Sequence, residues 1–417
     1  MTERSLTAAT DVYERLTRRC QSESRIPALA VAVHRADRPT WTFEVGSSGT
    51  DRVLDSATQF RLGSVTKTFT AILVMQCRDD GLIDLDDRID KHLEMRAYGD
   101  MTIRRLLSHT SGLQREPYGD VWDSLVAPEV KELIDQIDLA ERVLANGRRW
   151  HYSNLAFSLL GHMVAKLRGG TWAEILVDRI LTPLDLSSIT VDPTERAATG
   201  YLVEAYTDHA WPEAPMDTNA VGPAGQLWGS ATDLARWAGF LADPDTVDPD
   251  GRVIAPATLD EMRWPQTTIA EDVWPLGWGL GLMLAPQTTT PGERVMHIGH
   301  TGAMPGFLAG VFGRRGGAGR PKALGAAVLG SSGTAGAIVE LPHPLLAAAV
   351  EHDPADIDVW TIGSPAPAAY ASIMGQWWSE GDAIIFSFRD GKLAARYAAA
   401  PQGAPSSVFE PIDGDAD

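Results

Sequence analysis

Ser64 and Lys67 stand in a pattern that can support nucleophilic catalysis. Ser64 follows a glycine and precedes a helical run, so we expect it at a helix N-terminus, where free backbone N–H groups can stabilise an oxyanion. Lys67 follows less than one turn later, on the same face as the hydroxyl. A lysine that loses its charge in a cleft can take the serine proton. The alternative is a helix-capping serine beside a solvated surface lysine, because this spacing often occurs by chance.

A second pattern is Tyr152-Ser153-Asn154, directly before an apolar helical run. The Tyr152 phenol, if ionised or hydrogen-bonded to Lys67, can shuttle a proton. Asn154 can hold the lysine or a substrate carbonyl. In the alternative interpretation, Ser153 or Asn154 caps the helix and Tyr152 is a core aromatic residue.

A third pattern is His300-Thr301-Gly302-Ala303, at the end of a strand-like stretch. A glycine at a strand edge lets a substrate backbone approach closely. The N–H of Ala303 can then serve as the second donor to an oxyanion. The alternative for this segment is an ordinary turn.

The elements that must position these residues follow from hydrophobic periodicity. Strands are expected near both ends of residues 1–352 and helices in the middle. We therefore predict one mixed sheet built from both ends, with an all-helical subdomain inserted and a ligand cleft between them. The expected helices are 6–20, 65–79, 129–145, 154–168, 171–180, 231–242, 256–263 and 335–351. The expected strands are 26–33, 40–45, 277–285, 294–300, 306–313 and 323–331.

The composition changes near residue 353, which predicts a division of the chain. Residues 1–352 form the main domain, residues 353–366 a linker, and residues 367–417 a small β domain with a hairpin at Asp390-Gly391. The last segment is too short to bury a core alone. It therefore packs on the main domain, or it is the incomplete start of a larger β unit.

Composition and charge exclude several classes of protein. The 417 residues contain 36 basic and 55 acidic side chains, a net charge of −19 that disfavours binding to nucleic acid or anionic membranes. Cys20 and Cys77, the two cysteines, exclude a disulfide scaffold and a cysteine-built metal site. The N-terminus lacks the apolar core of a signal peptide, and no window is apolar enough to span a membrane. We therefore expect a cytoplasmic protein.

Taken together, the three patterns resemble the serine β-lactamase and penicillin-binding-protein-like superfamily, in particular its class C β-lactamase, esterase and D-aminopeptidase branch. The likeness covers about residues 10–350, and the tail from about 365 resembles the opening strands of a small β-barrel that many branch members append. The implied fold is α+β, an antiparallel sheet flanked by helices with the inserted helical subdomain. The segments that carry the likeness are 60–67, 81–87, 102–113 and 222–225.

The resemblance implies a role for each matching residue. Ser64 is the acylated nucleophile and Lys67 its base. Tyr152 passes a proton to the leaving group and helps to activate the deacylating water, while Asn154 orients Lys67 and the substrate amide. The backbone N–H groups of Ser64 and Ala303 form the oxyanion hole, which His300, Thr301 and Gly302 flank as substrate-binding residues.

His300 departs from the lysine that many β-lactamases carry in the third motif. A histidine with an ordinary pKa near 6.5 is mostly neutral at pH 7, so recognition of a carboxylate-bearing β-lactam should be weakened. We therefore expect a serine hydrolase that cleaves an ester or amide, with a small-molecule or peptide-like acyl substrate. The alternatives are an acyltransferase or cyclising thioesterase, a β-lactamase or D,D-peptidase, and a non-catalytic binding protein on the same fold. The absence of a signal peptide counts against the β-lactamase and D,D-peptidase.

The remaining features indicate no cofactor. No spacing resembles His-Glu-x-x-His, so we expect no metal, and no phosphate-binding glycine loop is present. His109 is expected in a helix-ending turn and His297 in a structural role. The tryptophan-rich stretch 274–281 either lines the cleft or packs on the sheet.

Overall fold

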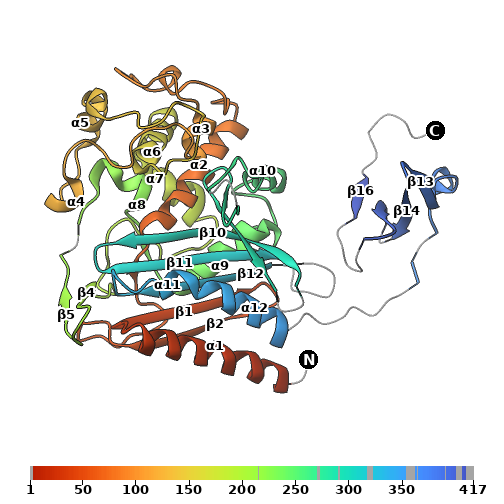
Figure 1. The fold of residues 1–417 in the computed structure, drawn as a ribbon, viewed down its shortest axis with the longest axis horizontal. Coiled ribbons are helices and arrows are strands. Elements are labelled where there is room, and N and C mark those ends of the chain that lie inside the picture. The colour runs from red at the N-terminus through yellow and green to blue at the C-terminus, as the bar shows by residue number, and fades with distance from the viewer. Residues whose placement is uncertain are drawn as a thin grey trace. The chain divides into compact units, whose positions relative to one another are not determined.

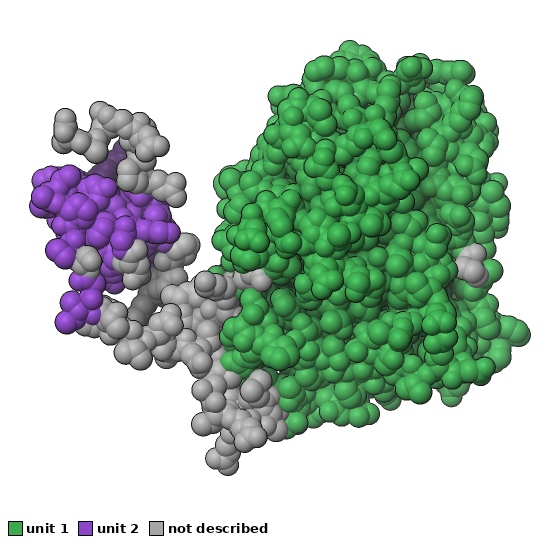
Figure 2. Space-filling model, turned by 180° about the vertical axis from the view of Figure 1, so that it is seen from behind, with its two compact units in different colours: residues 1–316, 321–354 green, residues 317–320, 355–417 purple. Residues whose placement is uncertain are grey.

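The computed structural model describes residues 3–214, 216–269, 273–289, 292–316, 323–353, 362–363, 365–389, 391–400 and 406–409. The chain divides into two compact units (Figure 2). The first comprises residues 1–316 and 321–354, and the second residues 317–320 and 355–417. Most of the predicted linker, 353–366, lies outside the described residues.

The first unit is built on an eight-stranded antiparallel sheet with the order β2-β1-β12-β11-β10-β9-β8-β7. Strands from both ends of the unit therefore meet in one sheet, which confirms the predicted fold class. The strands are β1 Ala28–Arg35, β2 Arg38–Gly46, β7 Thr267–Thr268, β8 Gly277–Trp278, β9 Met283–Thr288, β10 Arg294–Met304, β11 Phe307–Arg315 and β12 Ala323–Gly330.

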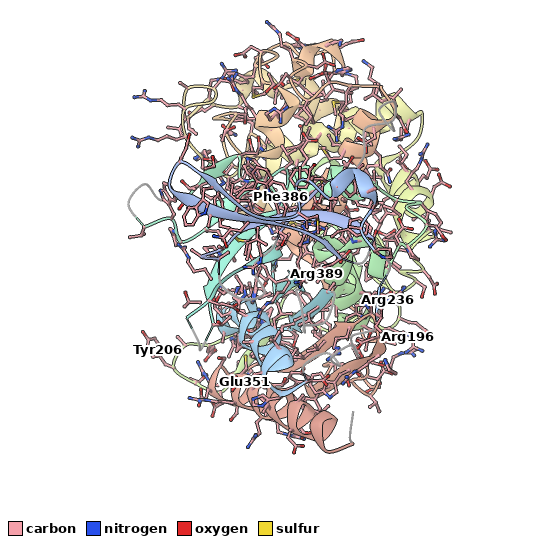
Figure 3. All side chains as sticks on the ribbon, turned by 90° about the vertical axis from the view of Figure 1, so that its right-hand side faces the viewer. Arg196, Tyr206, Arg236, Glu351, Phe386 and Arg389 are labelled. Atoms are coloured by element: carbon pink, nitrogen blue, oxygen red, sulfur yellow. The ribbon has the colours of Figure 1, made fainter. Side chains whose placement is uncertain are left out.

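Helices cover both faces of this sheet, with α9 (Ala231–Ala242) on one face and α1 (Glu3–Glu23) and α12 (Pro342–His352) on the other (Figure 1). The central strands β1 and β12 are buried throughout, which explains their apolar sequences without alternation. Glycines allow α9 to approach closely, because a Cβ on Gly313 or Gly325 would lie 2.0 Å from a carbonyl oxygen of that helix. Arg236, on the outer side of α9 and labelled in Figure 3, donates to the carbonyls of Leu184 and Asp185.

Apart from α9, most of the helices between β2 and β7 form the upper part of the unit in Figure 1. Two apolar helices, α2 and α6, pack together at its centre, and both are almost wholly buried. The helices are α2 Thr66–Asp79, α3 Ile103–Leu107, α4 Val121–Ser124, α5 Val130–Asp135, α6 Asn154–Arg168, α7 Trp172–Leu176, α8 Gly222–Gly225 and α10 Pro256–Met262. The short paired strands are β3 Phe60–Arg61 with β6 Trp228–Gly229, and β4 Tyr201–Val203 with β5 Ala210–Pro212.

The predicted helix over 129–145 is wrong in its second half. Helix α5 ends at Asp135 and a 3-10 turn follows at Ile137–Leu139. The backbone beyond the turn pairs instead with the loop after α3, since Gln114 N–H donates to the Glu141 carbonyl and Leu144 N–H to that of Gly112. The predicted strand 277–285 is likewise divided into β8 and β9, because the chain turns at Gly281 with a φ of +76°.

The second unit contains a four-stranded antiparallel sheet with the order β13-β14-β15-β16. Its strands are β13 Gly375–Ser379, β14 Asp382–Arg389, β15 Lys392–Tyr397 and β16 Ser407–Phe409. Arg389 pairs with Lys392, as the predicted two-residue hairpin requires, although Asp390 itself lies outside the described residues. Most side chains of this sheet are exposed or half-buried, so the described strands alone enclose little core.

None of the helices in the described part of the chain combines the length and apolar character needed to cross a membrane.

Candidate active site

Ser64 and Lys67 are in direct contact at the start of α2. Ser64 lies in the 3-10 turn η1 (Gly63–Val65), which runs directly into the helix. The Lys67 Nζ donates to Ser64 Oγ at 2.9 Å and to the Ala224 carbonyl in α8 at 2.7 Å. Complete burial holds the pKa of Lys67 well below its usual value, and the neighbouring Arg115 lowers it further, while Glu116 opposes both effects. A neutral Lys67 amine can accept the Ser64 proton, as a general base must.

The turn that carries Ser64 packs against the backbone of β10. Gly63 adopts a φ of +51°, and a Cβ built on it would lie 2.7 Å from Ala303 N. A Cβ on Gly302 would lie only 1.9 Å from the Leu62 carbonyl oxygen. Strand β9 pairs with β10 only as far as Gly299, so no strand of the described sheet covers this edge of β10 beyond that residue. Two glycines and an unpaired strand edge thus bring the Ala303 backbone beside the Ser64 turn.

Tyr152 lies directly before α6 and is half-buried on the wall of a cavity. Its phenol hydrogen-bonds Ser64, and the Lys67 Nζ lies 5.0 Å from its ring centroid. Burial raises the pKa of Tyr152 above its usual value, and the bond to Ser64 only partly opposes this. The neutral phenol therefore holds a proton next to the nucleophile.

Asn154 takes a different partner from the one expected. The Ser153 side chain accepts from Ala156 N–H and caps α6, which makes Asn154 the first helical residue. Its amide Nδ2 donates to Glu116 Oε1 at 2.7 Å. The expected bond from Asn154 to Lys67 is not among the hydrogen bonds of the described residues, because Ser64 and the Ala224 carbonyl bind the Lys67 amine instead.

His300 is completely buried and faces the same group of side chains. Burial, together with the nearby Lys67, lowers the pKa of His300 to about 3. Its Nδ1 hydrogen-bonds the Thr301 carbonyl. The imidazole is therefore neutral at physiological pH, as expected for a histidine without an acidic neighbour.

Aromatic rings surround Tyr152. The ring centroid of His109 lies 4.3 Å away, that of Trp278 5.8 Å, and that of His300 6.2 Å. His109 lies in the predicted turn that ends α3. Trp278 belongs to the tryptophan-rich stretch, and it lines the cleft, which was one of the two interpretations left open by the sequence.

Two cavities meet at this site. The smaller, of about 320 Å³, is mostly apolar, and the larger, of about 750 Å³, carries the carboxylates of Glu116, Asp123 and Glu213 on its wall. Arg115 and Ala303 border both cavities. The smaller cavity is lined by Ser64, Arg115, Trp150, Tyr152, Ile269, Leu276, Trp278, Met283, His300, Thr301, Gly302, Ala303, Leu308 and Val339.

Six of the eight residues selected from the sequence line the smaller cavity, Lys67 is hydrogen-bonded to Ser64 behind it, and Asn154 is bonded to Glu116. Sequence reasoning missed Arg115 and Glu116, which follow a resemblance segment by two and three residues. Their position directly after residues 102–113 is the signal that could have found them. Within the described part of the chain, no three His, Cys, Asp or Glu side chains gather in a way that could hold a metal ion.

The arrangement is suited to acyl transfer. A serine that is hydrogen-bonded to a buried amine and to a phenol provides a nucleophile in direct contact with a base and a proton donor. The sheet, the inserted helices and this site define a β-lactamase and transpeptidase-like protein of the α+β class. The family model described as "Beta-lactamase" matches residues 13–343, and the chain belongs to that family. The resemblance found in the sequence is therefore confirmed.

Curated relatives share this part of the chain. Penicillin-binding protein 4 of Amycolatopsis lactamdurans is 33% identical over 306 residues, which are 69% of this chain and 77% of that protein. D-alanyl-D-alanine-carboxypeptidase/endopeptidase AmpH of Escherichia coli (strain K12) is 26% identical over 263 residues, which are 60% of this chain and 66% of that protein.

Solved structures of lower identity share the fold. The D-stereospecific amidohydrolase from Streptomyces sp. has a TM-score of 0.64 at 24% identity, over 79% of this chain and 98% of that chain. The D-amino acid amidase from Ochrobactrum anthropi SV3 has a TM-score of 0.66 at 20% identity, over 82% of this chain and 98% of that chain. At 24% and 20% identity, these likenesses show the shared fold.

Proposed function

We propose that this protein hydrolyses an amide or ester through a covalent acyl-Ser64 intermediate. The observation that carries the proposal is the buried Lys67 amine at 2.9 Å from Ser64 Oγ, with a pKa held well below its usual value. A serine hydroxyl is a weak nucleophile at neutral pH unless a neighbouring base takes its proton, and an uncharged amine at this distance is such a base.

Acylation then proceeds in three proton transfers. Ser64 Oγ attacks the substrate carbonyl carbon while Lys67 takes its proton, and the C–O bond forms as the carbonyl π electrons move to oxygen. The backbone N–H groups of Ser64 and Ala303 stabilise this oxyanion, with a donor of this kind contributing about 3 kcal/mol in the transition state. Tyr152 gives its proton to the leaving group as the C–N or C–O bond breaks, and it recovers a proton from Lys67.

Deacylation reverses these roles. Water attacks the acyl carbon while Tyr152 passes its own proton to Lys67 and takes one from the water. Lys67 then returns a proton to Ser64 Oγ as the acyl C–O bond breaks, which releases the acid and restores the free serine. The reaction uses no metal and no organic cofactor, since each proton and each electron pair is held by these side chains or by substrate.

The larger cavity favours an acyl group that carries an amine. Of the charged side chains on its described wall, Glu116, Asp123 and Glu213 are acidic and Arg115 is basic. Burial raises the pKa of Glu213 above its usual value, and an ammonium group of the substrate would stabilise its charged form. An amino-acid amide or ester is therefore the proposed substrate class. The amidase and amidohydrolase named among the fold neighbours support a D-amino-acid type.

The test begins with intact-protein mass spectrometry after treatment with a fluorophosphonate, using Ser64→Ala as the control. We expect one adduct in the wild type and none in the variant. Matched D- and L-phenylalanine amides, each with a free or acetylated amine, then define the acyl group. Mass analysis of products formed with and without an added amine acceptor separates hydrolysis from acyl transfer. A wild-type protein that forms no adduct and turns over no amide or ester would refute the proposal in favour of a binding protein.

A further inference from the structure

His109 lies directly against Tyr152, and the mechanism above assigns it no role. It binds the backbone on both sides of the tyrosine. The His109 Nδ1 accepts from Ser153 N–H at 3.1 Å, and the His109 carbonyl accepts from His151 N–H at 2.7 Å. The ring centroids of His109 and Tyr152 are 4.3 Å apart. One residue thus holds the segment 151–153 by two hydrogen bonds and a ring contact.

The backbone of His109 adopts a left-handed conformation that few side chains enter readily. Its φ is +57°, just beyond the C-terminal end of α3. Glycine adopts this conformation without cost, and of the other residues asparagine, aspartate and histidine do so most often. Here the side chain that replaces the glycine supplies the acceptor for Ser153.

The charge state of His109 suits this role. The imidazole is completely buried, and its environment contains Lys67, His300, Arg115 and His151. Burial first, and then these basic neighbours, hold the pKa of His109 well below its ordinary value. Because Nδ1 accepts a hydrogen bond, the single proton of the neutral ring must be on Nε2.

We propose that His109 is a positioning residue, which holds the Tyr152 phenol against Ser64 so that the phenol can protonate the leaving group. The inference rests on the proposed function, because it acts through the role given there to Tyr152. It concerns a residue that never touches the substrate: His109 is absent from the lining of both cavities. If the phenol swings away, Ser64 and Lys67 remain paired, so within acylation only the protonation of the leaving group is impaired.

Three substitutions separate positioning from packing. His109→Asn retains an acceptor near the Nδ1 position and tolerates a positive φ, whereas His109→Gln moves its amide to the Nε2 position and disfavours that φ. His109→Ala removes the acceptor entirely. We expect His109→Asn to retain kcat within about threefold of the wild type.

The decisive readout is the leaving group, because a good leaving group needs no proton. A 4-nitroanilide and a 4-nitrophenyl ester of the same amino acid form the matched pair. We expect His109→Gln to lower kcat on the anilide by about 100-fold, the usual size of a general-acid contribution, with little change in KM. On the ester we expect the acylation rate, measured from the burst of 4-nitrophenol, to fall at most a few-fold, and fluorophosphonate to label Ser64 at the wild-type rate. In a Tyr152→Phe background, His109→Gln should have no further effect on the anilide.

Equal losses on anilide and ester, or no loss on either, would overturn the inference. If thermal melting shows that His109→Gln or His109→Ala is unfolded, nitrogen-15 NMR of the histidines in the wild type tests whether His109 Nδ1 accepts from Ser153 N–H. The inference requires an unprotonated Nδ1 at His109, and a protonated Nδ1 would refute it. A wild type that cleaves neither substrate would refute the proposed function instead, and the NMR result would still decide whether His109 accepts from Ser153.

Discussion

Replacing Gly302 with alanine should move the backbone N–H of Ala303 away from that of Ser64, the two donors of the proposed oxyanion hole. The added Cβ would lie 1.9 Å from the Leu62 carbonyl oxygen, whereas ordinary van der Waals contact begins at 3.4 Å. The difference, 3.4 − 1.9 = 1.5 Å, must come from movement of β10 away from the Ser64 turn. Neither group can rotate aside, because one is a backbone carbonyl oxygen and the other a Cβ bonded directly to the backbone. A hydrogen bond from Ala303 N–H to the oxyanion does not survive a displacement of that size.

The expected loss follows from the value of one oxyanion donor. Removing such a donor lowers kcat by about 100- to 1,000-fold. Gly302→Ala should therefore lower kcat by this factor on a 4-nitrophenyl ester. Because 4-nitrophenolate leaves readily, attack by Ser64 on the carbonyl is the slow step of acylation for this substrate. KM should change much less, since the donor acts mainly on the transition state.

Gly336→Ala is the matched control. It makes the same chemical change where a Cβ meets nothing within 4 Å, so activity should stay at the wild-type level. Thermal melting of both variants separates a local displacement from unfolding. A folded Gly302→Ala variant with wild-type kcat would refute the assignment of Ala303 to the oxyanion hole.

Three further predictions concern charge. Lys67→Met should raise the free energy of unfolding at pH 7, measured with urea, because the wild type must keep a neutral amine that the unfolded chain protonates. Because the unfolded chain binds one more proton than the folded chain, the free energy of unfolding of the wild type should rise with pH above the lowered folded-state pKa of Lys67. The rise should reach up to about 1.4 kcal/mol per pH unit and should end near pH 10.5, where the unfolded lysine also loses its proton. The same slope in the variant would contradict this account. His300→Lys should raise kcat/KM on carboxylate-bearing esters relative to neutral ones, and an unchanged ratio would exclude the proposed effect of the third motif. Glu116→Gln should lower kcat/KM about tenfold for a free-amine amide and leave its N-acetylated counterpart unaffected, which steady-state kinetics on the pair will check.

The candidate site residues were predictable because each lies in a short motif whose chemistry is local. Ser64 and Lys67 are three residues apart at the start of one helix, and a helix fixes their relative position. Helices α6 and α9 were predicted with their observed bounds, since both have caps and clear periodicity.

What escaped prediction depends on contacts between distant segments. The partner of Asn154 is Glu116, 38 residues earlier in the chain, and nothing in either local sequence indicates the pairing. The end of α5 is set by backbone pairing of residues 141–144 with the loop after α3, which competes with a helical pattern that is present in the sequence. The position of His109 behind Tyr152 likewise exists only after folding.

The early end of β9 has a consequence for association between molecules. An uncovered strand edge offers N–H and C=O groups to any extended chain, and exposed edges of this kind promote aggregation. Beyond Gly299 the uncovered edge of β10 borders the two cavities, and His300 and Gly302 on it are buried. An extended ligand that enters the cavities can meet these backbone groups as an added strand would. The open edge can therefore serve as a template for a bound chain.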